Sequence, residues 1–268
     1  MIRFWTKLQY PENRAVLVED GKIIDSIPDH SPKTPARWVA CVGDYKDQLV
    51  IVRPANVEFW KRDGSELLNS FVCKKLHAVH AVAQYQDQLA VCSSGLDLFF
   101  LADYDGNITW EWWAETWGVG GHNPAYDSDD WAQKQTNGKE YKLVDGGHYN
   151  SLWVSSGERL ITSSLKRNKI IALTPMRDGF ELIRDCEEEG IHTPILDKNT
   201  LIYGLRIGVM AGGQHVLQDH RWVKHIRRTP EGFVCTHEMG VTFVDFAWKV
   251  IREFSLPRPF GLAALEIT

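Results

Sequence analysis

Short runs of β-branched and aromatic residues alternate with short polar segments along almost the whole chain. The polar segments carry turn signals, such as the Asp-Gly pairs at 63–64 and 105–106. Turn signals at this spacing are typical of antiparallel hairpins and leave no room for crossover helices. The pattern therefore predicts an all-β protein.

The strand pattern repeats with a period of about 40 residues. The segment that begins at Trp38 aligns with the segment that begins at Ala78, and a shared Asp-Gln-Leu triplet falls at 47–49 and again at 87–89. Units with the same order of strands and turns begin at His148 and His192, and a tighter one begins at His225. A fixed period of this length is typical of the blades of a β-propeller.

The two ends of the chain supply one further unit. Residues 261–268 read as a single strand, and the first thirty residues contain three more. Pairing the C-terminal strand with the N-terminal strands would remove two exposed sheet edges. The sequence thus predicts one domain over residues 1–268, a six-bladed β-propeller closed by this pairing, with five or seven blades as alternatives.

Residues 114–147 interrupt the repeat and do not resemble a blade. The segment contains several glycine, aspartate and aromatic residues. A long insertion in a compact domain is usually functional or disordered, and its aromatic content argues against disorder. We expect it to cap one mouth of the axial channel.

Composition and charge narrow the class of partner. Eleven Trp, eleven Phe and eight Tyr suit the wedge-shaped spaces between packed sheets. The net charge of -5 and the lack of a long basic run argue against binding to nucleic acid. The phosphate-loop, GxSxG and HExxH patterns are also missing, which discounts those enzyme classes.

No apolar stretch resembles a signal peptide or is long enough to cross a bilayer, so we expect a cytoplasmic protein without a membrane partner. Five cysteines without CxxC spacing are expected to be buried thiols in a reducing compartment.

Five of the ten histidines occupy related positions in different units. His77 and His148 each lie 12 residues before the first leucine of the second strand of their units. His80 and His192 each lie nine residues before the corresponding leucine, and His225 has a similar place in the last unit. Innermost strands line the channel of a propeller, so these side chains should converge on its axis.

Imidazole is a common ligand of transition metals, and three or four such groups would form a metal site. The expected metal is divalent iron, zinc, copper or nickel. His77 and His80 have opposite parity in a regular strand, so only one of them should face the axis. The alternative is that each histidine fills the core and binds no metal.

Other polar residues are candidates for supporting roles. Asp97 and Asn150 carry the oxygen atoms that commonly accept a hydrogen bond from a ligating histidine. His122, in the insertion, would complete the site if that loop folds inward. Arg206 would bind an anionic group of a substrate or form an ion pair between blades.

Two of these segments also carry a resemblance. The sequence SSGLDLFFLADYDGNITWEWW at 93–113 and HYNS at 148–151 resemble uncharacterised bacterial propellers related to the arylsulfotransferase-like, NHL-repeat and quinoprotein-like groups. The resemblance covers about residues 77–205 and implies that the central channel is the site. In arylsulfotransferases a channel histidine is the nucleophile, and retinal-type dioxygenases hold iron on four axial histidines.

Two classes of function remain. The first is an enzyme with a histidine-lined axial site that acts on a small molecule, with a metal or with histidine alone as base or nucleophile. The second is a non-catalytic propeller that binds a protein or a small ligand. The sequence does not distinguish an oxygenase, a lyase and a hydrolase, and it does not indicate the oligomeric state.

Overall fold

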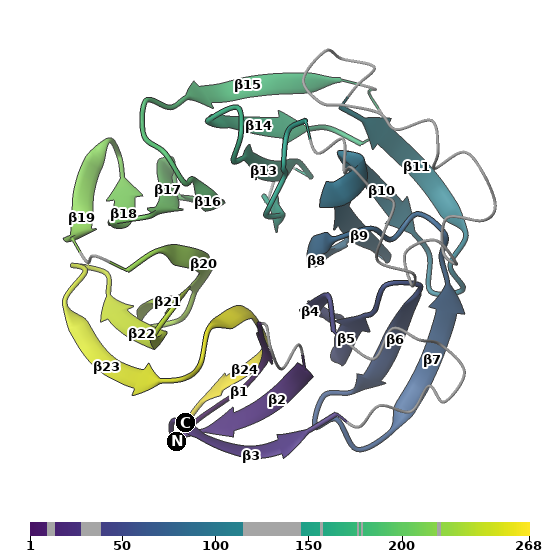
Figure 1. The fold of residues 1–268 in the computed structure, drawn as a ribbon, viewed down its shortest axis with the longest axis horizontal. Helices are drawn as coiled ribbons and strands as arrows, with labels where there is room; N and C mark the ends of the chain where they lie inside the picture. The colour runs from purple at the N-terminus through teal and green to yellow at the C-terminus, as the bar shows by residue number, and fades with distance from the viewer. Residues whose placement is uncertain are drawn as a thin grey trace, which may run out of the picture.

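The computed structural model describes residues 1–9, 14–27, 39–114, 146–155, 158–175, 177, 179–218 and 221–268. In these residues the strands form six four-stranded antiparallel sheets arranged around a common axis (Figure 1). The chain is therefore a six-bladed β-propeller, as predicted, and the alternatives of five and seven blades are wrong. No helix within the described ranges is long and apolar enough to span a bilayer.

The four strands of each blade are described in order from the axis outward. The innermost strands are β24 (Pro259–Ile267), β4 (Cys41–Tyr45), β8 (Val79–Tyr85), β12 (Trp153–Val154), β16 (His192–Asp197) and β20 (Val223–Arg228). The second strands are β1 (Ile2–Leu8), β5 (Gln48–Val52), β9 (Gln88–Ser93), β13 (Leu160–Ser164), β17 (Thr200–Leu205) and β21 (Gly232–His237).

The third strands are β2 (Arg14–Glu19), β6 (Asn56–Lys61), β10 (Leu98–Ala102), β14 (Lys169–Leu173), β18 (Gly208–Ala211) and β22 (Gly240–Asp245). The outermost strands are β3 (Lys22–Ser26), β7 (Leu67–Val72), β11 (Ile108–Trp113), β15 (Phe180–Asp185), β19 (Gln214–Gln218) and β23 (Val250–Ser255). A short 3-10 helix, η1 (Ser94–Leu96), joins β9 to β10.

Burial explains why many strands read as continuous apolar runs. Strand β10 is buried at all five positions, whereas most of β23 is exposed. Blades stack face to face, so the middle strands are covered on both faces and alternation disappears. The outermost strands meet solvent and keep polar residues.

Six clusters of buried residues fill the six spaces between neighbouring blades. Aromatic rings occupy these wedges, as the composition predicts. In one of them the ring of Phe59 lies 4.8 Å from that of Tyr104, on the next blade. All five cysteines are buried and none forms a disulfide.

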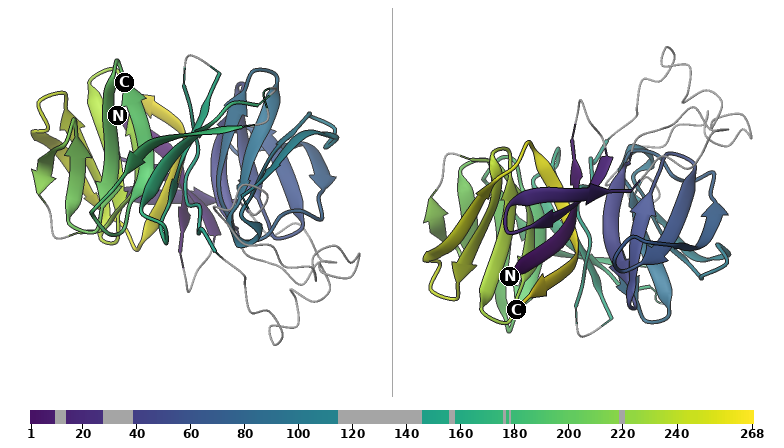
Figure 2. Two further views of the ribbon diagram at one scale, coloured as in Figure 1. Left: turned by 90° about the horizontal axis from the view of Figure 1, so that it is seen from above. Right: turned by 90° about the horizontal axis from the view of Figure 1, so that it is seen from below.

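The ring closes where the two termini meet, side by side at one blade (Figures 1 and 2). Strand β24 pairs antiparallel with β1, with Ile2 opposite Ile267. Beyond the strands, the N-terminal amine of Met1 donates a hydrogen bond of 2.6 Å to the carbonyl of Thr268. The predicted closure is confirmed, and it hides edges that would otherwise be exposed.

The structure locates the two flanks of the insertion. Residues 115–145, including His122, lie outside the described part, so the expected cap is not placed. Both flanks bind Asp97: Ala114 donates its N–H to the backbone carbonyl of Asp97, and Gly147 donates to its carboxylate. The insertion therefore leaves and rejoins the propeller at one buried residue.

Candidate functional site

A pocket of about 340 Å³ lies on the axis. All six innermost strands, or the segments leading into them, contribute to its wall. The lining residues are Cys41, Val42, Gly43, Asp44, His80, Ala81, Val82, Ala83, Gln84, Asn150, Ser151, Leu152, Trp153, Thr193, His225, Ile226, Arg227, Arg228, Phe260, Gly261 and Leu262. Segments from every blade thus meet at one site.

Consecutive residues line this pocket, not alternating ones. Runs such as 41–44, 80–84 and 225–228 each contribute every position. The reason is that each innermost strand pairs on one side only and turns its other edge toward the axis. The N–H and C=O groups on these edges are not used by the sheets, so they can form hydrogen bonds in the channel.

β-Bulges interrupt two of the innermost strands. In β8 one extra residue, His80, lies between the paired positions Val79 and Ala81. In β20 the extra residue is Lys224. A bulge interrupts the alternation of side chains and redirects one of them. Strand parity alone therefore does not determine which histidine faces the pocket.

His80 and His77 have different environments. His80 lines the pocket, and its ring centre lies 5.0 Å from that of His148 and 5.6 Å from that of Phe260. His77 is buried beneath η1, where Gly95 donates its N–H to the His77 carbonyl. Of the two, His80 is a lining residue of the axial pocket and His77 is not.

His192 is a buried, neutral imidazole. Its Nδ1 lies 3.1 Å from the carbonyl of Gly190 and 3.2 Å from the indole nitrogen of Trp222. The pKa of His192 is lowered to about 3, mainly by burial; the hydrogen bond to Gly190 opposes this shift, and electrostatic interactions with Lys224, His148 and Arg206 contribute to it. His192 therefore carries no charge at neutral pH.

His225 lines the pocket. The pKa of His225 is lowered to about 4, mainly by burial; the charge of Arg227 contributes to this shift and Asp44 opposes it. Its Nδ1 is buried and has no hydrogen-bond partner among the described residues. A neutral imidazole has one donor and one acceptor, so His225 has hydrogen-bonding capacity available to a ligand.

The predicted metal site of three or four histidines is not assembled in the described part of the chain. There, no three His, Cys, Asp or Glu side chains lie close enough together to hold a metal ion. His80 and His148 are adjacent, while His192 packs on Trp222 and His225 lies near Asp44. A transition-metal site held by protein usually has three or four ligands, and this arrangement does not supply them.

The four residues expected to support a site have other contacts, apart from His122, which is not described. Asp97 is fully buried and binds Gly147. Asn150 lines the pocket, donates to the carbonyl of Ile191 and accepts a 2.6 Å hydrogen bond from Ser163. The guanidinium of Arg206 lies 5.2 Å from the ring of Trp222.

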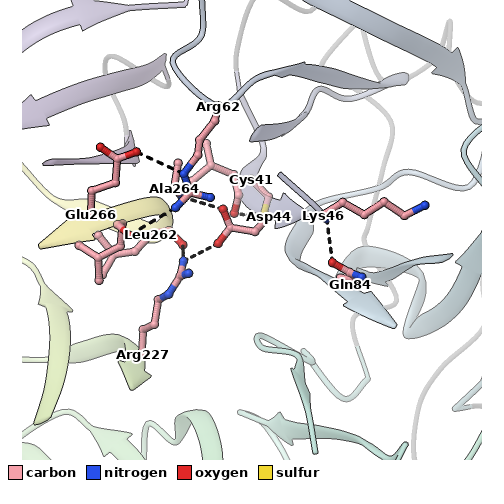
Figure 3. A network of polar contacts seen from close by, with 11 residues as sticks. Cys41, Asp44, Lys46, Arg62, Gln84, Arg227, Leu262, Ala264 and Glu266 are labelled. Atoms are coloured by element: carbon pink, nitrogen blue, oxygen red, sulfur yellow. Dashed lines mark hydrogen bonds and ion pairs between the residues drawn. The ribbon is translucent and has the colours of Figure 1, made fainter. Parts of the chain in front are cut away.

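An ion pair that sequence reasoning missed joins three blades beside the pocket (Figure 3). Arg227 in β20 contacts the Asp44 carboxylate in β4 at 2.5 Å and donates to the carbonyl of Leu262 in β24. Asp44 also accepts a 2.6 Å hydrogen bond from the N–H of Ala264. The pair fixes the relative positions of three pocket walls.

Two lysines near the pocket were also missed. Lys7 in β1 and Lys224 in β20 are both largely buried. Lys7 is a charged residue in a largely apolar strand, and that contrast was the available signal for it. Strand β20 is basic along most of its length, so Lys224 does not stand out in the sequence. Lysine is rarely buried without a partner, so such positions are candidates for binding.

Fold and pocket together define a six-bladed β-propeller with a polar axial site. No protein-family model matches the chain, and no curated protein matches its sequence. Solved structures match it in fold. A protein of unknown function from Bacteroides caccae has a TM-score of 0.66 at 8% identity, with 98% of each chain covered.

Two further structures place the fold among proteins with different roles. A chain of a nidogen/laminin complex has a TM-score of 0.68 at 11% identity, covering 98% of each chain. A streptogramin B lyase has a TM-score of 0.59 at 10% identity, covering 97% of this chain and 86% of the other. At these identities the likeness shows the fold alone.

Proposed function

We propose that this protein is an enzyme that transforms a small polar molecule in the axial pocket, with histidine as acid and base and without a metal. The observation that carries the proposal is the meeting of His80 and His225 in one pocket wall built by all six blades. Histidine is the most common side chain in general acid–base catalysis.

The two histidines suit different parts of this role. His225 is neutral, and its ring is suited to orienting a bound molecule by hydrogen bonds. His80 is paired with His148, so a proton taken up at one ring has a second imidazole beside it. Proton transfer of this kind serves elimination and hydrolysis, and it favours a lyase or hydrolase over an oxygenase.

A neighbour in fold supports catalysis on this scaffold. A virginiamycin B lyase from Staphylococcus aureus is solved as a catalytically inactive histidine-to-alanine variant with quinupristin, with a TM-score of 0.58 at 10% identity and coverage of 95% of this chain and 84% of that one. It shares only the fold with this chain. It is an example of a propeller of similar form in which the variant of one histidine is catalytically inactive.

The test is conversion of small molecules followed by NMR. The full chain is incubated with mixtures of lactones, amides, hydroxy acids and phosphate esters, with and without EDTA. We expect turnover that EDTA does not reduce, and that falls at least about a hundredfold in His80→Gln and His225→Gln. The control is His215→Gln, because His215 is exposed in the outermost strand β19.

Each other outcome selects a different function. Turnover that EDTA abolishes and added iron or zinc restores would support the metal-dependent enzyme instead. If a small molecule binds without turnover, and with equal affinity to His80→Gln, His225→Gln and His215→Gln, the non-catalytic propeller would be favoured. Turnover that does not change in the His80 and His225 variants would contradict the proposed site.

A further inference from the structure

Cationic and imidazole side chains surround the end of the axial channel at which the innermost strands begin. We call this end the amino rim and define it by Lys7, His80, His148, His192 and Lys224. These residues lie on β1, β8, β16 and β20 or, for His148, in the segment that leads into β12. Five of the six blades therefore contribute to it.

In one half of the amino rim, Lys224 and His192 both contact the side chain of Trp222. The Lys224 ammonium lies 5.0 Å from the Trp222 ring and donates a 3.0 Å hydrogen bond to the side chain of Gln9. The indole of Trp222 packs edge-on against His192, with ring centres 5.0 Å apart. Arg206 stacks on the same indole and brings a third cation to this side.

In the other half, Lys7 and His80 both contact the side chain of Phe260. The Lys7 ammonium lies 5.9 Å from the Phe260 ring, and that ring contacts His80. Phe260 lines the pocket, and so does Cys41. The Cys41 side chain is close enough to Lys7 to influence the pKa of its ammonium group. Lys7 thus lies next to Phe260, a residue of the pocket wall.

Lys7 is a buried cation without a counter-charge among the described residues. Lys7 is 9% exposed, and among the described residues its ammonium donates a hydrogen bond of 2.9 Å to the carbonyl of Ala40. An ammonium has three donors, so two are left for another partner. Burying an unpaired charge is costly, and an anion at this point would offset that cost.

The surroundings of Lys7 reinforce this need. Burial lowers its pKa to about 8, the thiol of Cys41 opposes the shift and the charge of Lys224 adds to it. In the part of the chain that the structure describes, the carboxylate that pairs with Lys224 is that of Glu238, 3.6 Å away and half exposed. The field at the amino rim is therefore positive, while the whole chain has a net charge of -5.

We propose that the amino rim binds the carboxylate or phosphate group of a small organic anion, with Lys7 and Lys224 as its charged partners. This rests on the proposed function, because it names the substrate class of the same pocket. An anion held by the two lysines reaches into the pocket past Phe260, toward His80. The enzyme therefore acts on an acid or a phosphate ester.

Anion binding should depend on pH through Lys7. The groups that face its ammonium are Ala40 and Cys41 from β4 and the segment before it, Phe260 from β24 and Lys224 from β20. Lys7 is charged below its pKa of about 8 and neutral above it. Affinity for an anion should therefore be highest below pH 8 and fall as pH rises through that value.

The test is isothermal titration calorimetry with inorganic phosphate, malonate and the neutral diamide malonamide. We expect the wild type to bind at least one anion and not malonamide, and Lys7→Met and Lys224→Met each to weaken binding about tenfold or more. Binding of phosphate alone would assign a phosphate ester, and binding of malonate alone a carboxylic acid. The control is Lys22→Met, because Lys22 is exposed in β3.

Several results would overturn the proposal: no binding of either anion, equal binding of malonamide, or equal losses in Lys22→Met. If a lysine variant unfolds, the pH titration of the wild type decides, since affinity that does not fall above pH 8 contradicts the role of Lys7. Anion binding without turnover would sustain this inference and reject the proposed enzyme. Turnover of neutral molecules without anion binding would sustain the proposed enzyme and reject this inference.

Discussion

The buried carboxylate of Asp97 accepts a 2.7 Å hydrogen bond from the backbone N–H of Gly147, 50 positions further along the chain. The backbone carbonyl of Asp97 also accepts from Ala114. One residue, in the left-handed conformation with φ 49°, thus holds both flanks of residues 115–145 against the blade that contains β8 to β11. This role is structural. It differs from the role suggested by the sequence, in which Asp97 accepts a hydrogen bond from a metal-ligating histidine.

Replacing Asp97 by Asn should lower the free energy of unfolding by about 1–2 kcal/mol. Asparagine tolerates the left-handed conformation, so the exchange removes mainly the charge of the acceptor. Urea unfolding measures the change, with Asp105→Asn as control because Asp105 lies exposed in a turn. An equal loss in both variants would refute the anchoring role.

Removing residues 262–268 should expose two sheet edges and cause aggregation. The deletion takes away most of the β24 partners of β1, including Ala263, which lies opposite Trp5. Size-exclusion chromatography and thermal unfolding measure the effect. Removal of Thr268 alone is the control, since it leaves the strand register intact. A monomeric truncated protein with unchanged melting would contradict the closure.

Acid should destabilise the protein through His192. The pKa of His192 is about 3 in the folded chain and 6.5 in its ordinary state, so the unfolded chain takes up a proton first as pH falls. Stability is therefore fully present above about pH 6.5 and is lost progressively below it, by up to about 1.4 kcal/mol per pH unit.

His192→Gln should flatten this slope, because glutamine does not titrate. Urea midpoints measured between about pH 4 and pH 7 test the expectation. His215→Gln should keep the wild-type slope, since His215 is exposed. A slope that is the same in the wild type and in His192→Gln would show that other groups cause the acid sensitivity.

Gly95→Ala should destabilise the fold by about 1–3 kcal/mol. A Cβ at Gly95 would lie 1.9 Å from Nδ1 of His77, a distance that no packing adjustment of a few tenths of an ångström relieves. Gly179→Ala is the control, because its nearest neighbour atom is 3.9 Å away. Chemical denaturation measures both variants, and His77→Ala in the Gly95→Ala background should recover part of the loss.

Sequence reasoning went furthest where a local pattern repeats. The period of about 40 residues, the Asp-Gly turns and the lone strand at 261–268 were enough for the six blades and their closure. The last unit was placed two residues late, because its innermost strand begins at Val223 and not at His225. The candidate site was predicted to lie on the axis, and His80 and His225 do line a pocket there.

The sequence by itself determined the class of fold, because hydrophobic runs and turns are local properties and their pattern is repeated in each blade. The side chains that meet in the axial pocket were decided by tertiary structure. Bulges in β8 and β20 override strand parity, and ring closure brings Lys224 within 3.0 Å of Gln9 across 215 positions of sequence. Contacts between blades depend on the geometry of the whole ring, so no short segment encodes them.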